Sequence, residues 1–310
     1  MRCILSACVL LFCSALCGQT ITNALLWRIV RASHADTSYL YGTMHSTDER
    51  AFSHVADAQS VLSRCTTVAG ELDLSGTGNM ALALMDRLLL PEGSTLSALY
   101  TPRQWKRLQP ALRAELGPLM APMMQRMKPF FILATLSQGD MAADRPRMLD
   151  DALMQEGRDL GKRVVGLETV EEQMAALDAI PLNEQARLLH DHVLGNKRGD
   201  DLDALHDAYA GKDLERIRRL TNEASTASAA FEKALISDRN RILVQRMDSV
   251  MSADGNVLFL IGAAHLPGPE GLIHGLRAMG HLVQPVGAQP GGVKEPAIIR
   301  GAGKQDNNVE

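Results

Sequence analysis

The chain has 310 residues, 46% of them hydrophobic, and this is enough to form a substantial core. Its 32 basic and 36 acidic residues give a formal net charge of −4. This ordinary globular composition lacks the basic surplus that favours nucleic-acid binding, so we expect no nucleic-acid partner.

The first residues have the pattern of a signal peptide. Arg2 precedes an apolar stretch over residues 4–16, and Ala15 and Cys17 lie at a small-residue spacing before Gly18. The stretch is too short for a membrane span, and no later apolar run is long enough. We predict that residues 1–17 are removed and that the protein is exported, to the periplasm or beyond the cell.

Two alternatives stay open for this segment: an uncleaved N-terminal anchor and a lipoprotein. Residues 16–18 partly match a lipobox, but Leu16 stands where that motif has a small residue, so we rank lipoprotein anchoring below simple export. Four of the five cysteines fall in the removed segment, which leaves Cys65 and no internal disulfide. Its apolar neighbours predict that Cys65 is buried.

Strand and helix patterns alternate at the start of the predicted mature chain. Residues 25–30 and 38–41 have the pattern of two strands joined as a hairpin. Residues 51–62 have helical spacing, and residues 66–74 are typical of another strand.

The pattern then becomes helical over residues 79–138, which are rich in Leu and Met and interrupted by prolines. We predict a helical cap over the site. The methionines in this segment could suggest a copper site, but flexible core filling explains them better; they are Met120, Met123, Met124 and Met127. A helix over residues 149–160 and a short buried strand over residues 163–168 follow.

A second helical region covers residues 170–251, and the apolar run at residues 257–261 predicts a central strand covered on both faces. A helix over residues 271–279 and a strand over residues 281–286 close the pattern. The sequence therefore predicts an α/β fold: a mostly parallel sheet flanked by helices, with long helical insertions. We expect one domain, residues 18–286, and a disordered tail, residues 287–310.

Two predicted strands end in the same Gly-x-x-His pattern. Gly42 precedes His45 in the first, and Gly262 precedes His265 in the second. Ligands of open α/β sheets bind beyond the carboxyl ends of the strands, which is where both histidines fall. Neutral imidazole is a good ligand for zinc, manganese, cobalt or iron, so the pair is a candidate metal site.

Two carboxylates also follow predicted strands and could complete this site. Glu71 and Glu168 each come after a strand, and one could bind the metal while the other accepts a proton from water. Arg239 could hold an oxyanion or a substrate carboxylate, although a surface ion pair with Asp238 is the alternative.

Other polar clusters carry weaker signals. His190 and His192 would point to different faces of a helix, and Ser46 lies in no Gly-x-Ser-x-Gly elbow. Nucleotide-binding fingerprints are absent from the sequence.

Several short segments, in this order, resemble the TraB/GumN family, which includes the Tiki-type metal-dependent proteases. They are Leu26-Trp27-Arg28, residues 39–45, residues 166–169 with Gln173, Arg239-Asn240, and residues 262–266 with Gly268 and Gly271. The resemblance spans residues 25–286 and implies an α/β core similar to erythromycin-esterase and haem-uptake relatives. It also implies a divalent metal, with manganese or cobalt favoured and zinc as the alternative. The functional positions that it implies are His45, His265, Glu71, Arg239 and Asn240, with Glu168 in a less defined role.

These observations favour a metal-dependent hydrolase, most simply a peptidase acting on a peptide or protein. We predict His45, His265 and Glu71 as metal ligands, and we predict catalytic roles for Glu71, Glu168, Arg239 and Asn240. One alternative is an exported binding protein without catalysis, because some family members are named for pheromone shutdown or polysaccharide gene clusters. Another is an esterase-like enzyme that needs no metal.

Overall fold

The computed structural model describes residues 23–31, 36–73, 75, 86–195, 198–224 and 229–287. The predicted signal peptide lies outside these ranges, as does the predicted tail after residue 287. Within them, no helix is both long enough and apolar enough to cross a membrane.

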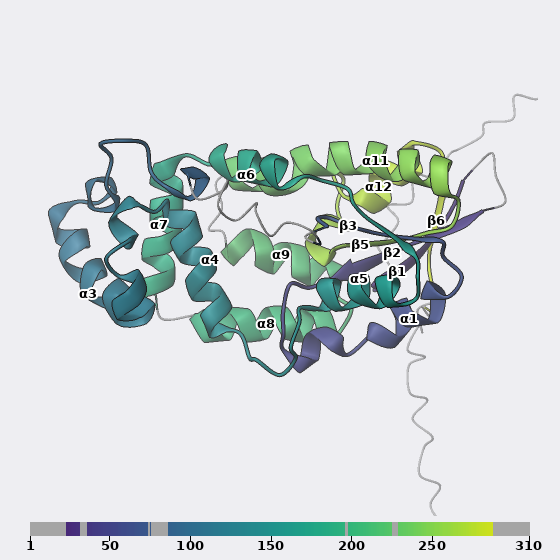
Figure 1. Ribbon diagram of the computed structural model, residues 1–310, viewed down its shortest axis with the longest axis horizontal. Coiled ribbons are helices and arrows are strands. Elements are labelled where there is room, and N and C mark those ends of the chain that lie inside the picture. Colours follow the sequence, from purple (N-terminus) through teal and green to yellow (C-terminus); the bar gives the residue numbers. More distant parts are fainter. Residues whose placement is uncertain are drawn as a thin grey trace, which may run out of the picture.

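A six-stranded sheet forms the centre of the fold, in the order β4-β3-β5-β2-β1-β6 (Figure 1). The strands are β1 Leu26–Val30, β2 Thr37–Thr43, β3 Thr67–Gly70, β4 Arg163–Gly166, β5 Val257–Gly262 and β6 Leu282–Pro285. β4, β3, β5 and β2 run parallel, whereas β1 is antiparallel to both β2 and β6. The predicted α/β class is therefore confirmed, with a parallel core and an antiparallel edge.

Burial along the strands follows their place in the sheet. β5 lies between β3 and β2, and Val257 through Ile261 are buried, as expected for a parallel strand covered on both faces. The buried strand predicted at residues 163–168 is wrong in burial and length. β4 is an edge strand with Arg163 and Gly166 exposed, and it ends before Glu168.

Helices cover both faces of the sheet. α11 (Asp238–Asp254) and α12 (Leu272–Ala278) lie on one side in Figure 1, and α1 (Val55–Leu62) and α5 (Leu149–Asp159) lie on the other. A short 3-10 helix, η1 (Glu49–Phe52), precedes α1. These layers enclose the main hydrophobic cluster of the described residues.

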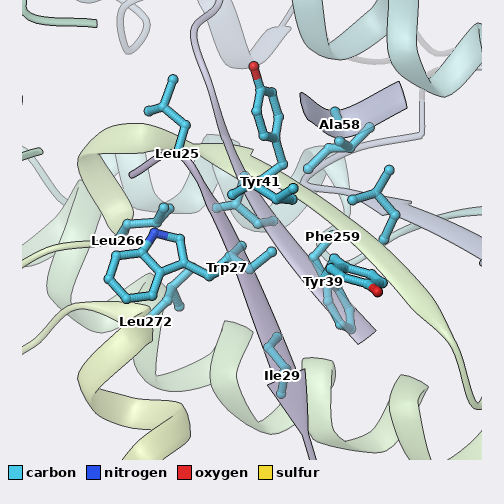
Figure 2. Packing of buried hydrophobic residues seen from close by; sticks show 14 of the residues in the cluster. Leu25, Trp27, Ile29, Tyr39, Tyr41, Ala58, Phe259, Leu266 and Leu272 are labelled. Atoms are coloured by element: carbon cyan, nitrogen blue, oxygen red, sulfur yellow. The ribbon is translucent and has the colours of Figure 1, made fainter. Parts of the chain in front are cut away.

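Trp27 of β1 belongs to this cluster and lies beside Leu266 and Leu272 (Figure 2). Its indole nitrogen donates to the carbonyl of Ala24 at 2.8 Å. The first strand is thereby packed against the segment that carries the second Gly-x-x-His motif. Cys65 is buried as predicted, and burial raises the pKa of its thiol to about 11.

A second hydrophobic cluster joins the first helical insertion to α7 (Leu182–Leu194) of the second helical region, at the end of the molecule away from the sheet in Figure 1. It is formed by α3 (Pro102–Met120), α4 (Pro129–Asp140), α7, η2 (Leu96–Leu99) and η3 (Met124–Arg126). Met124 and Met127 are buried in it, in agreement with their interpretation as core fillers.

The remaining helices lie between the insertion and the sheet. They are α6 (Val170–Asp178), α8 (Arg198–Ala210), α9 (Leu214–Ala224), α10 (Ala229–Glu232) and the π-helix η4 (Lys233–Ser237), which leads directly into α11. They form much of the wall of the pocket described next.

Candidate active site

The two Gly-x-x-His motifs leave the same edge of the sheet. β2 and β5 are parallel neighbours, and Thr43 pairs with Gly262. A Cβ atom on Gly42 would lie 3.1 Å from Leu266 Cδ2 and 3.2 Å from Ala263 Cβ, so glycine permits the close approach of the motifs. Both histidines line one pocket of about 430 Å³, together with Glu71 and Arg239.

His265 is held in one orientation by Asn240. The Asn240 amide nitrogen donates to the backbone carbonyls of His265 and Glu270, at 3.2 and 2.7 Å. Its oxygen therefore accepts from Nδ1 of His265, at 2.6 Å, and this fixes Nε2 as the nitrogen that bears the lone pair. Burial lowers the pKa of His265 to about 4, despite the opposing charge of Glu71, so the ring is neutral at pH 7.

Asp150, the second residue of α5, orients His45. Its carboxylate lies 2.9 Å from Nδ1 of His45, which directs Nε2 away from this contact. The side chain is exposed over 56% of its surface, although many protein atoms lie near the ring. Burial alone would lower the pKa of His45, but the hydrogen bond and charge of Asp150, together with the charge of Glu71, raise it to about 9. Sequence reasoning missed Asp150, which follows no strand and belongs to no motif.

Arg239 joins the two carboxylates. Its Nη2 donates to Glu71 and to Glu168, at 2.5 Å each, and Nε donates to Glu168 at 3.0 Å. All three side chains are at most 14% exposed. The predicted alternative, a surface pair between Arg239 and Asp238, does not form, because Asp238 pairs with Lys233 and Arg241.

Glu71 is ionised under all ordinary conditions. Burial alone would raise its pKa. His265, which is protonated at the low pH where Glu71 titrates, the charge of Arg239, and a hydrogen bond from the Gly262 amide at 2.8 Å together lower this pKa to about 2. A carboxylate this acidic is a ready ligand for a cation and a weak proton acceptor near neutral pH.

A π-helix places Arg239 beside the pocket. In η4 the amide of Asp238 donates to the carbonyl of Lys233, five residues earlier, and the Leu235 carbonyl accepts from Nη1 of Arg239 at 3.1 Å. Such π-turns are rare and concentrate at functional sites. The sequence gives no signal for this one.

The donor chemistry of the pocket suits a divalent cation only in part. His45 and His265 each have Nδ1 engaged, which directs Nε2 towards a ligand, but Nε2 of His265 accepts a hydrogen bond from Nη1 of Arg239 at 3.3 Å. Glu71 supplies an anionic oxygen. Among the residues that the structure describes, however, no three His, Cys, Asp or Glu side chains are grouped closely enough to hold a metal. The guanidinium of Arg239 already forms an ion pair with Glu71, the carboxylate that a metal would need as a ligand.

The other polar residues considered from the sequence have different surroundings. His190 contacts Asp191 and His192 contacts Asp140, and neither histidine lines the pocket. Ser46 is fully buried and hydrogen-bonded to Nε2 of His206 at 2.8 Å, a contact that sequence reasoning missed. This pair fixes the chain just after His45.

The fold and pocket define an α/β protein whose polar site lies at the carboxyl edge of a parallel sheet. The sequence matches the TraB/PrgY/gumN family over residues 25–285, and the chain belongs to this family. No solved structure gives a significant match.

Three curated relatives show similarity across most of the chain, each at 23% identity. The Metalloprotease TIKI2 of Danio rerio aligns over 88% of this chain and 62% of its own length. For the Metalloprotease TIKI1 of Danio rerio the shares are 86% and 64%, and for the Metalloprotease TIKI2 of Xenopus tropicalis they are 86% and 60%. The chain thus spans less than two thirds of these relatives.

Proposed function

We propose that this protein is an exported, metal-dependent hydrolase that cleaves peptide bonds in a peptide or protein substrate. The observation that carries the proposal is the meeting of two oriented histidines, Glu71 and Arg239 in one pocket. The names of the relatives, all metalloproteases, support the same class. Export rests on the signal-peptide pattern of residues 1–17.

In this proposal His45, His265 and Glu71 would hold the metal, and Arg239 would give up its contact with Nε2 of His265. The resemblance to the family favours manganese or cobalt, with zinc as the alternative. When bound, a divalent cation lowers the pKa of water and polarises a carbonyl group.

The remaining groups take complementary roles. Glu168 accepts the proton, because Glu71, with a pKa of about 2, is a poor proton acceptor near neutral pH. Arg239 stabilises the developing oxyanion, since its charge is permanent and it already lies against both carboxylates. Asn240 holds His265 in the tautomer in which Nε2 carries the lone pair.

A second candidate function, exported binding without catalysis, is favoured by one observation. Arg239 already pairs with both Glu71 and Glu168, and the described residues include no grouped set of three metal donors. Metal binding therefore requires Glu71 to release at least part of its contact with Arg239.

Metal content and peptide cleavage test the first proposal directly. We expect purified protein to retain about one divalent ion per chain by mass spectrometry and to cleave members of a broad peptide library, because two histidines and a carboxylate line the same pocket. His45→Ala and His265→Ala should each lose the ion and cleavage while keeping the helical circular-dichroism signal.

His274→Ala is the matched control, because His274 is exposed on α12 and lies outside the pocket. It should retain metal and activity. Full activity in either pocket variant would contradict the mechanism, and bound metal without turnover would support the binding alternative.

A further inference from the structure

The pocket has two chemically different walls. Strand ends, the loops after them and the first turn of α11 contribute its charged groups. The helices opposite contribute a set of apolar side chains, Phe130 of α4, Ala176 and Leu177 of α6, Leu205 of α8, Ile217 of α9 and Leu235 of η4. We call this set the apolar wall.

Several members of the apolar wall belong to neither hydrophobic cluster. Phe130, Leu177 and Leu235 are only partly buried and pack into neither the main core nor the insertion core. α6 has no buried residue at all. Apolar side chains gathered in a concavity, rather than packed into a core, are typical of a binding site for an apolar group.

The apolar wall adjoins the charged groups at two points. Gln173 donates to Glu168 at 3.2 Å, and it lies three and four residues before Ala176 and Leu177, on the same face of α6. Leu235 provides the carbonyl that accepts from Arg239. A ligand group against this wall therefore lies next to the carboxylates and the guanidinium.

We propose that the apolar wall is a specificity subsite, which binds one bulky apolar side chain of a peptide beside the bond that is cleaved. The inference rests on the proposed hydrolase function and names its substrate class: peptides with Phe, Leu or a similar residue at that position. A pocket of about 430 Å³ lies within the roughly 300–1,000 Å³ typical of ligand sites, which leaves room for neighbouring backbone.

This subsite is tested by the binding and cleavage of peptides that differ from one another at a single residue. The probes are acetylated and amidated pentapeptides Gly-Gly-Xaa-Gly-Gly, with Xaa as Phe, Leu, Gly, Asp or Lys. Calorimetry on Glu168→Gln protein measures binding without turnover. We expect the Phe and Leu peptides to bind at least about tenfold more tightly than the others, because burial of a large apolar side chain increases affinity by roughly that factor.

A pair of neighbouring alanines provides the matched variants. Ala176→Trp fills the apolar wall and should abolish the preference for Phe and Leu, whereas Ala175→Trp makes the same change at an exposed position outside the pocket and should leave it intact. Equal binding of all five peptides, or equal effects of the two variants, would overturn the subsite.

Wild-type cleavage of the same peptides separates this inference from the proposed function. Selective binding of Phe and Leu peptides without any cleavage would keep the subsite and reject the hydrolase. Cleavage without apolar preference would keep the hydrolase and reject the subsite.

Discussion

Asn240 is buried, and its side chain makes three hydrogen bonds. It bonds the His265 ring and two backbone carbonyls. Asn240→Ala leaves these buried groups unpaired, so we expect a loss of roughly 1–3 kcal/mol in unfolding free energy, measured by urea denaturation. Gln245→Ala, at an exposed position of the same helix, should change it by less than about 0.5 kcal/mol. Similar losses in both variants would contradict this role.

The pKa values of the pocket predict how the metal-free protein responds to pH. His265 has a lowered pKa of about 4, against 6.5 for free histidine, so the folded state prefers the neutral ring. Its contribution to stability is complete above pH 6.5 and is lost as the pH falls towards 4. The corresponding free energy is roughly 3 kcal/mol.

Denaturation of chelator-treated protein between pH 7 and 4 measures this loss. His265→Gln should flatten the profile in that window, whereas His274→Gln, on the exposed side of α12, should keep the wild-type slope. The sign is opposite for His45. Its raised pKa of about 9 contributes stability that is complete below pH 6.5 and is lost as the pH rises through 9.

The residues that sequence reasoning could place are those tied to strand ends. His45, Glu71 and His265 follow strands that share one edge of the sheet, and the structure brings them to one pocket. Asp150 and His206 come from helices, where side-chain direction depends on packing that one sequence does not specify. Their contacts with His45 and Ser46 span more than 100 positions of the chain, and no pattern within the sequence records them.

At the scale of elements, the contact between α5 and β3 leaves no room for an added methyl group. A Cβ atom on Gly157 would lie 2.8 Å from Val68 Cγ2, and Val68 is a buried, branched residue of the sheet. Gly157→Ala should therefore cost about 1–3 kcal/mol in unfolding free energy. Because α5 also carries Asp150, metal affinity should fall in the same variant.

Gly139 of α4 is the matched control for this substitution. A Cβ atom there would meet nothing within 4 Å, so Gly139→Ala should be neutral or stabilising by up to about 1 kcal/mol. Thermal unfolding of both variants checks the pair. Equal stabilisation of the two variants would show that helix propensity, rather than contact with β3, determines the effect.

Elements with a clear hydrophobic pattern in their own sequence were predictable. Elements whose burial or shape depends on neighbouring elements were not. The uninterrupted apolar run of β5 identifies a central strand. β4 carries similar apolar residues but lies at an edge, and the order of strands in the sheet decides that difference. The π-turn before Arg239 could not be predicted, because its local sequence fits an ordinary helix equally well.

At the scale of the whole molecule, the described residues form two separate hydrophobic clusters. We therefore expect the parts of the chain around them to open with different free energies. Leu112 is fully buried in the insertion, and Leu112→Ala should cost about 2–5 kcal/mol there. We expect faster hydrogen exchange in α3, α4 and α7, with β5 still protected. Leu258→Ala, an equally buried change in β5, should accelerate exchange across the sheet. Uniform acceleration in the Leu112 variant would show that the clusters unfold as one unit.

The position of β5 also determines when this protein can finish folding. β5 separates β2 from β3, yet it is the fifth strand in chain order, and β6 arrives later still to flank β1. A growing chain that has not reached residue 257 contains two strand pairs, β1 with β2 and β3 with β4, without the strand that joins them. Completion of the sheet must await the synthesis of β5 and β6. The pocket forms only after β5 has joined β2, because its two histidines follow these neighbouring strands.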